Sequence, residues 1–192
     1  MRLFVALAIP TEVRENLVSL ICELRAVDPN PKWINPDNLH VTLKFIGKVA
    51  PEEIMKIGDA LAAVHSQQQV IAEFRDVGFF PDARRPSVAW VGIKSPPVLS
   101  FLAAEVNRVL VPLGISREEK PFVPHLTIAR FKTTRLSPAL RAEIEKRKFR
   151  KFGTLAATEL HLIESKLKSS GAEYTTLRSF RFAPEESKGS RP

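Results

Sequence analysis

The sequence predicts an α+β fold built of two lobes with antiparallel β-sheets. Apolar runs with strand character alternate with helical stretches, and several strands follow each other with no helix between them. Strands that adjoin in this way favour antiparallel sheets over a doubly wound parallel sheet. The order strand, helix, strand also occurs twice, from residue 3 to 46 and from residue 87 to 131. Two lobes related by a pseudo-twofold axis would explain this repeated order.

The first half of the chain is expected to hold three strands and two helices. Residues 3–9 form an apolar run that is too short to cross a membrane, and we predict the first strand there. A helix follows from residue 11, with apolar residues at helical spacing: Val13, Leu17, Leu20, Ile21 and Leu24. We expect a strand at 39–46, a helix from 51 to about 67, and a strand at 70–79.

The second half is expected to repeat this alternation. Its predicted elements are a strand at 87–93, a helix at 98–111, a strand at 122–131, a short charged helix at 138–148, and strands at 154–166 and 173–182. Residues 184–192 are polar and contain Pro and Gly, so we expect a disordered tail there. Residues 1–183 would then form a single bilobal domain.

Composition limits the class of protein and of partner. Hydrophobic residues make up 44% and charged residues 26%, as in a soluble chain with a real core. The 29 basic and 21 acidic residues give a net charge of +8, which favours an anionic partner such as nucleic acid. The single cysteine, Cys22, excludes an intramolecular disulfide and favours the reducing cytoplasm. We expect Cys22 to be buried in a helix, and no apolar run indicates a membrane protein.

Two short segments share one pattern, LHVTLKF at 39–45 and PHLTIAR at 124–130, in a chain with four histidines. Side chains alternate between the two faces of a strand, so His40, Thr42 and Lys44 are predicted on one face. Phe45 would then point into the core. In the second segment His125 and Thr127 share a face. Arg130 has the opposite parity and would join them only through a bulge or by its length.

Two imidazoles and two hydroxyls suit phosphodiester chemistry. One imidazole can accept a proton from water while the other protonates the departing oxygen. Threonine hydroxyls can bind the non-bridging phosphate oxygens, and a strained cyclic ester needs no metal. A metal centre is disfavoured because Thr stands where a ligand is needed, and covalent catalysis and ATP binding have no motif. One such pair is usually structural, but two copies favour a site.

Longer segments carry a resemblance to a known family. They are RLFVALAIP, WINPDNLHVTLKFIG, GFFPDARRPSVAWVGI, PFVPHLTIARF and ELHLIESKL with YTTL, which together run nearly end to end. With the tetrads HVTL at 40–43 and HLTI at 125–128, the chain resembles the two-histidine phosphoesterases, and among them the RNA 2′,3′-cyclic phosphodiesterases, once named 2′-5′ RNA ligases. The resemblance implies a cleft between two antiparallel sheets with helices on the outer faces.

The resemblance also implies an activity and a set of roles. RNA 2′,3′-cyclic phosphate ends, such as those of tRNA-derived fragments, would be hydrolysed to 2′-phosphomonoesters with no cofactor and no metal. His40 would protonate the leaving O3′ and His125 would accept the proton of water, while Thr42 and Thr127 bind the phosphate.

Three further residues are candidates for substrate binding: Lys44, Arg130 and, by stacking on a base, Phe45. We expect a monomer. The alternatives are a ligase that forms 2′-5′ linkages between tRNA-like halves and a non-catalytic module that binds RNA ends or nucleotides.

Overall fold

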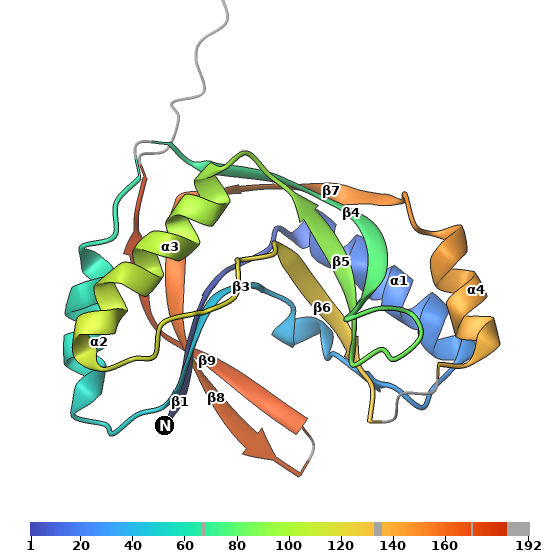
Figure 1. The fold of residues 1–192 in the computed structure, drawn as a ribbon, viewed down its shortest axis with the longest axis horizontal. Helices are drawn as coiled ribbons and strands as arrows, with labels where there is room; N and C mark the ends of the chain where they lie inside the picture. Colours follow the sequence, from blue (N-terminus) through green and yellow to red (C-terminus); the bar gives the residue numbers. More distant parts are fainter. Residues whose placement is uncertain (67, 133–135, 170, 184–192) are drawn as a thin grey trace, which may run out of the picture.

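Two antiparallel sheets form the frame of the molecule in the computed structural model, which describes residues 1–66, 68–132, 136–169 and 171–183 (Figure 1). The first sheet has the strand order β3-β1-β8-β9. Its strands are β1 (Arg2–Leu7), β3 (Val41–Lys48), β8 (Glu159–Lys168) and β9 (Gly171–Arg181). The second sheet has the order β2-β6-β5-β4-β7. Its strands are β2 (Lys32–Trp33), β4 (Val70–Phe80), β5 (Val88–Lys94), β6 (His125–Arg130) and β7 (Lys151–Ala157).

The helices pack on the sheets in a crossed arrangement. They are α1 (Thr11–Val27), α2 (Glu53–Ala62), α3 (Val98–Leu110) and α4 (Pro138–Lys146), with short 3₁₀ turns η1 (Pro36–Asn38) and η2 (Val111–Leu113). Helix α1 follows β1 of the first sheet but packs against β7 of the second sheet and against α4. Helices α2 and α3 pack against β9 and β3 of the first sheet (Figure 1). The helix that follows a strand of one sheet thus packs on the other sheet, and this exchange holds the two lobes together.

The predicted fold class is confirmed, and so is the repeated order of elements. The antiparallel pairs β1–β3 and β5–β6 take equivalent places in the two sheets, as the repeat predicts. The predicted strand at 154–166 is wrong, because it is two strands that lie in different sheets. The chain leaves the second sheet at Ala157 and enters the first at Glu159. The carbonyl of Thr158 between them accepts a hydrogen bond from the Phe182 amide (2.8 Å).

Other boundaries differ by a few residues. Helix α2 ends at Ala62 instead of near 67, and β6 begins at His125 because the segment before it, PFVP, contains two prolines that cannot donate ladder hydrogen bonds. The predicted tail, 184–192, lies outside the described residues. None of the helices in the described ranges is both long and apolar enough to span a membrane.

Helix α1 shows how the core is patterned. Val13, Leu17, Leu20, Ile21 and Leu24 are all buried, as their spacing predicts. The prediction for Cys22 is wrong, because its side chain is exposed. Residue 22 lies about 100° round the helix from residue 21, and the buried stripe ends before it reaches that position. Core residues of both sheets join in one continuous apolar cluster, to which β1 contributes Leu3, Val5 and Leu7.

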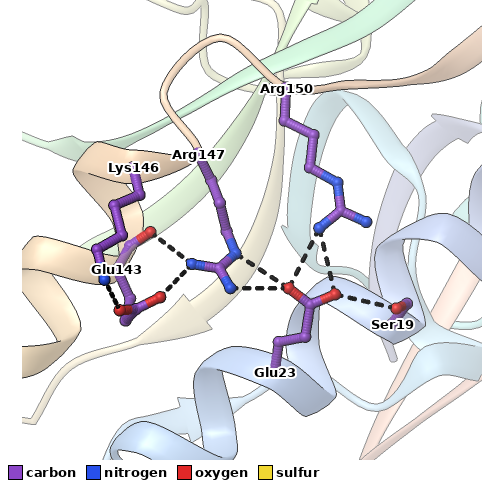
Figure 2. A network of polar contacts seen from close by, with 6 residues as sticks. All are labelled: Ser19, Glu23, Glu143, Lys146, Arg147 and Arg150. Carbon is purple, nitrogen blue, oxygen red and sulfur yellow. Dashed lines mark hydrogen bonds and ion pairs between the residues drawn. The ribbon is translucent and has the colours of Figure 1, made fainter.

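A network of ion pairs connects α1 to α4 and to the residues that follow α4 (Figure 2). Glu23 accepts hydrogen bonds from Arg147 (3.0 Å) and Arg150 (3.2 Å), and Arg147 also pairs with Glu143. Although partial burial raises the pKa of Glu23, these two arginines leave it below its ordinary value. The basic run at 141–151 is therefore partly engaged within the protein.

Candidate active site

The two tetrad histidines line one cleft of about 840 Å³. His40 immediately precedes β3, the edge strand of the first sheet, and His125 begins β6 of the second sheet. Thr42 and Thr127 line the same cleft. The structure thus brings together all four residues predicted from the tetrads, from distant parts of the chain.

A β-bulge at the last residue of each tetrad shapes both walls of the cleft. On β3, Thr42 pairs with Ala6 and Lys44 with Val5, so Leu43 is an extra residue. On β6, Thr127 pairs with Trp90 and Ala129 with Ala89, so Ile128 is extra. An extra residue reverses the alternation of side chains beyond it. The two tetrads therefore share a bulge as well as a sequence pattern.

The bulge on β3 overturns the predicted direction of Phe45, while Lys44 lines the cleft as predicted but is buried. Lys44 pairs with Val5 of the core and is only 3% exposed. Its ammonium donates to the Ser116 carbonyl (2.5 Å) and pairs with Glu118 at 3.4 Å. Phe45 pairs with Phe4 on the cleft side and is 59% exposed, so the expectation of a core position is wrong.

The bulge on β6 puts Arg130 on the same face as His125 and Thr127, where ideal strand alternation would not place it. Arg130 pairs with Val88, and both line the cleft that contains His125 and Thr127. The carbonyl of the bulged Ile128 accepts a hydrogen bond from the amide of Ile34 (3.0 Å), the residue that follows β2. Phe45 and Arg130 occupy equivalent positions, two residues beyond each tetrad's fourth member. One wall of the cleft thus offers an aromatic ring where the other offers a guanidinium.

Both imidazoles are held by the same backbone contact. The Nδ1 atom of His40 lies 2.6 Å from the carbonyl oxygen of Asn38, and that of His125 lies 2.8 Å from the carbonyl oxygen of Val123. A carbonyl can only accept, so Nδ1 carries the proton in each neutral ring. The other nitrogen, Nε2, is left to accept a proton when the ring is neutral and to donate one when it is charged.

The environment of His40 disfavours its charged form. Burial and then the guanidinium charges of Arg130 and Arg14 lower its pKa from 6.5 to about 4, although the hydrogen bond to Asn38 raises it. Arg130 belongs to the second sheet and His40 to the first, so this effect acts across the cleft. The imidazole of His40 is therefore neutral at pH 7 in the free protein.

Aromatic rings surround each histidine, and sequence reasoning missed the most important one. The ring of Tyr174, on β9, lies 5.3 Å from that of His40, and Phe4 lies 4.7 Å from the same ring. Across the cleft, Phe80 meets His125 edge-on at 4.9 Å. Tyr174 is the only tyrosine in the chain, but it lies far from either tetrad in sequence. The pairing of β9 with β8 and the hydrogen bond from the Asn38 side chain to the Ala172 carbonyl (2.7 Å) bring it to the cleft.

The donor set of the cleft does not resemble a metal site. Among the described residues no group of three His, Cys, Asp or Glu side chains lies close enough together to hold a metal ion. The residues beside each imidazole are a threonine and aromatic rings, which are poor ligands for the metals that histidine binds. What the cleft offers is two proton carriers, two hydroxyls and a guanidinium, a set that suits acid–base chemistry on a phosphate ester.

Comparison with known proteins gives the family of this cleft. The 2′-5′ RNA ligase superfamily matches residues 12–168. A relative named RNA 2′,3′-cyclic phosphodiesterase, from Archaeoglobus fulgidus, is 36% identical over 94% of this chain and 99% of its own. Another of that name, from Thermus thermophilus, is 34% identical over 96% of this chain and 92% of its own. The chain belongs to this superfamily of two-histidine phosphoesterases.

Solved structures agree with this assignment. The crystal structure of TT0787 of Thermus thermophilus has a TM-score of 0.78 at 29% identity and covers 95% of this chain and 98% of its own. That of E. coli LigT complexed with 3′-AMP has a TM-score of 0.77 at 25% identity, over 94% of this chain and 97% of its own. The bilobal fold with its cleft is therefore the fold of the superfamily.

Proposed function

We propose that this protein hydrolyses RNA 2′,3′-cyclic phosphodiester ends to 2′-phosphomonoesters. The observation that carries the proposal is the pair of imidazoles on opposite sheets, each with Nδ1 bound to a backbone carbonyl and each lining the same cleft. Relatives that match nearly the whole chain are named for this activity. The enzyme is a metal-independent cyclic phosphodiesterase.

The reaction uses the two histidines in opposite senses. His125 accepts a proton from a water molecule through Nε2, and the water oxygen forms a bond to phosphorus. The bond between phosphorus and O3′ breaks, and Nε2 of protonated His40 gives its proton to O3′. The product is a 2′-phosphomonoester with a free 3′-hydroxyl. Thr42, Thr127 and Arg130 bind the non-bridging oxygens, where negative charge accumulates.

His40 can act as a proton donor only if its imidazole gains a proton when the substrate binds. With a pKa of about 4 in the free protein, His40 holds no proton near neutral pH. A phosphodiester anion in the cleft counters the charges of Arg130 and Arg14 and favours the imidazolium. The acid therefore forms when the anionic substrate binds, and this couples binding to activation.

The aromatic residues and Lys44 have supporting roles. Phe45 is exposed in the cleft and offers a face on which a nucleobase stacks, and Tyr174 lines the same cleft. Lys44 adds positive charge to the cleft, but its hydrogen bond to Ser116 makes its main role the positioning of the loop at 114–124. The partner is RNA, and the protein acts as a monomer in the cytoplasm, where its single cysteine stays reduced.

A single assay tests the proposal. A nucleoside 2′,3′-cyclic monophosphate and an RNA with a 2′,3′-cyclic phosphate end are incubated with the protein in EDTA, and ³¹P NMR identifies the product. The proposal predicts turnover to the 2′-phosphate. Saturable binding with no product would instead support a non-catalytic binding module, and activity that needs added metal would contradict the mechanism.

A further inference from the structure

The catalytic cleft has a second end that the tetrads do not form. Its volume of about 840 Å³ lies near the upper end of the range of roughly 300–1,000 Å³ that small-molecule sites occupy. Part of its wall comes from the loop at 114–124 and from helix α3, which packs against β3. We call this part the loop end of the cleft. The proposed reaction assigns no substrate contact to its residues.

Helix α3 keeps the loop end open. The residues of α3 that line the cleft are Ser100, Ala103, Ala104 and Asn107, which are spaced i, i+3, i+4 and i+7 and so share one face of the helix. Three of these four residues are serine or alanine. The helix therefore leaves space in the cleft where larger side chains would fill it.

A buried lysine fixes the loop beside this space. The ammonium of Lys44 donates to the Ser116 carbonyl (2.5 Å) and pairs with Glu118 (3.4 Å). The amide of Glu118 in turn donates to the side chain of Asn107 on α3 (3.2 Å). A buried ammonium is costly unless it is paired and hydrogen-bonded. Lys44 therefore favours the one position of the loop that gives it these partners.

Two cations on the loop have no acidic partner. Arg117 and Lys120 line the cleft and are exposed, and neither forms an ion pair within the part of the chain that the structure describes. Of the two acidic residues between them, Glu118 pairs with Lys44, and Glu119 is not among the residues that line the cleft. The loop end thus carries positive charge that favours an anionic group of the ligand.

The proposed reaction indicates which anion would meet these cations. It puts the ribose of the terminal nucleotide on the side of His40, with the base stacked on Phe45. In an RNA strand, the next ionised group is the phosphate on O5′ of this nucleotide, which links it to the upstream nucleotide. Lys44 directly precedes Phe45 and contacts the loop, so the loop end begins beside the stacked base.

We propose that Arg117 and Lys120 bind the phosphate on O5′ of the terminal nucleotide, and that Lys44 is a positioning residue that holds their loop for this contact. The cleft then fits the end of an RNA strand, and a cyclic nucleotide without a 5′-phosphate leaves part of it empty. The proposal rests on the proposed function, because the placement of the ribose and the base comes from it.

The test compares kcat/KM for three substrates. They are a nucleoside 2′,3′-cyclic phosphate, the same compound with a 5′-phosphate, and a dinucleotide with a 2′,3′-cyclic phosphate end. The last two carry a phosphate on O5′, and the wild type should prefer both to the first by about ten-fold or more, since charge-assisted hydrogen bonds contribute about this much.

The double variant Arg117→Gln/Lys120→Gln should lose most of this preference. The readout is a ratio between substrates, so a general effect of the variant on the cleft cancels. Lys56→Gln, at an exposed position on α2 outside the cleft, is the control and should keep the preference.

A second double variant tests the positioning role of Lys44. Lys44→Met is combined with Glu118→Gln, so that no unpaired carboxylate is left beside the loop cations. It should lower the preference about three-fold or more although both cations remain. It should add no further loss in the Arg117→Gln/Lys120→Gln background, because the effects of residues that act through one contact are not additive. An equal loss on all three substrates would contradict the positioning role.

Binding gives a result that does not depend on turnover. Isothermal titration calorimetry compares adenosine 2′,5′-bisphosphate with adenosine 2′-monophosphate, which resembles the product. The wild type should bind the bisphosphate about ten-fold more tightly, and Arg117→Gln/Lys120→Gln should bind the two alike. The difference in the wild type should become smaller as salt is added, because contacts between exposed charges are screened.

Three outcomes would overturn the proposal. They are a wild type with no preference for the 5′-phosphate, a preference that Arg117→Gln/Lys120→Gln leaves unchanged, and a preference for the dinucleotide without one for the 5′-phosphorylated mononucleotide. The last would place the upstream nucleoside, and not its phosphate, at the loop. If the wild type bound the bisphosphate more tightly through these cations but hydrolysed no cyclic substrate, the phosphate site would stand and the proposed function would be wrong.

Discussion

The strands that carry His40 and His125 have the same local build but different surroundings. Each has the same tetrad pattern, the same bulge at the fourth residue and the same hydrogen bond from Nδ1 to the carbonyl two residues before. Beyond the bulge, the first strand presents Phe45 and the second presents Arg130. The first histidine packs among Phe4 and Tyr174, and the second meets the edge of Phe80.

In the proposed mechanism, this difference lets one motif serve as acid on one strand and as base on the other. The shared parts fix the tautomer and the direction of each ring. The surroundings that differ set the free energy of protonating each imidazole. A positive charge on His40 is disfavoured because this ring is buried among aromatic side chains and faces the guanidinium of Arg130. On this account, His40 releases its proton easily once it holds one, and the substrate provides the anion that lets it hold one.

The largest expected effect is the loss of either imidazole. His40→Ala and His125→Ala should each reduce kcat for a 2′,3′-cyclic nucleotide by about 10²–10⁴-fold, because general acid and general base catalysis contribute about that much. Steady-state kinetics in EDTA measure the loss. His65→Ala, at an exposed histidine outside the cleft, is the matched control. Wild-type turnover in either cleft variant would remove that histidine from the mechanism.

Arg130 links the two strands electrostatically. It lies on β6, beside His125, but its charge lowers the pKa of His40 on the other sheet. Arg130→Met should lower kcat/KM by about 10²-fold, as does the loss of a donor to developing negative charge. In the free protein the same change should raise the pKa of His40, because it removes a positive charge near that ring. A slower enzyme with an unchanged His40 titration would mean that Arg130 binds phosphate without facing His40.

Phe45 occupies the position on β3 that is equivalent to Arg130 on β6, and we expect it to act in binding the base. Phe45→Ala should raise KM about ten-fold with little change in kcat, because base stacking contributes roughly 1–3 kcal/mol to binding. Ile71→Ala, at an exposed apolar position on β4 outside the cleft, serves as the control. If KM stayed the same and kcat fell instead, Phe45 would act on the chemistry and not on the base.

The smallest expected effect is on stability in acid. The unfolded chain protonates His40 near pH 6.5, but the native protein does so only near pH 4. The unfolded state therefore binds more protons in this window, and the stability fully present above pH 6.5 falls as the pH drops toward 4, by about 3 kcal/mol from this residue. Urea unfolding of the wild type and of His40→Gln at pH 7 and pH 4.5 isolates the contribution. Parallel losses in the two proteins would refute it.

The sequence predicts the four tetrad residues of the cleft better than it predicts the residues that follow each tetrad. His40, Thr42, His125 and Thr127 follow from the repeated tetrads, because residues of equal parity share a face until a bulge intervenes. Both bulges fall on the last residue of a tetrad, Leu43 or Ile128, and an ordinary apolar residue gives no sign of one. This is why the predicted direction of Phe45 is wrong, and why the sequence could offer a bulge as one way for Arg130 to reach the cleft but could not say that a bulge is present.

Contacts between distant segments were also beyond sequence reasoning. Tyr174 reaches His40 because β9 pairs with β8 and β8 with β1, and because the Asn38 side chain bonds to the Ala172 carbonyl, all contacts between segments far apart in the chain. The split of the predicted strand 154–166 has the same origin, since a single residue, Thr158, separates strands of two different sheets. Local patterns predict the elements, but the sheet to which each belongs depends on packing that no short window contains.

The most direct test of the account is the titration of His40 by NMR with and without a bound phosphate anion. The Cε1–H resonance of His40, assigned by comparison with His40→Gln, is followed from about pH 3.5 to 8 in the free protein and with saturating 3′-AMP. The account predicts a midpoint near 4 in the free protein and a rise of more than about one unit when the anion is bound. A midpoint that the anion leaves unchanged would contradict the claim that the substrate charges its own proton donor.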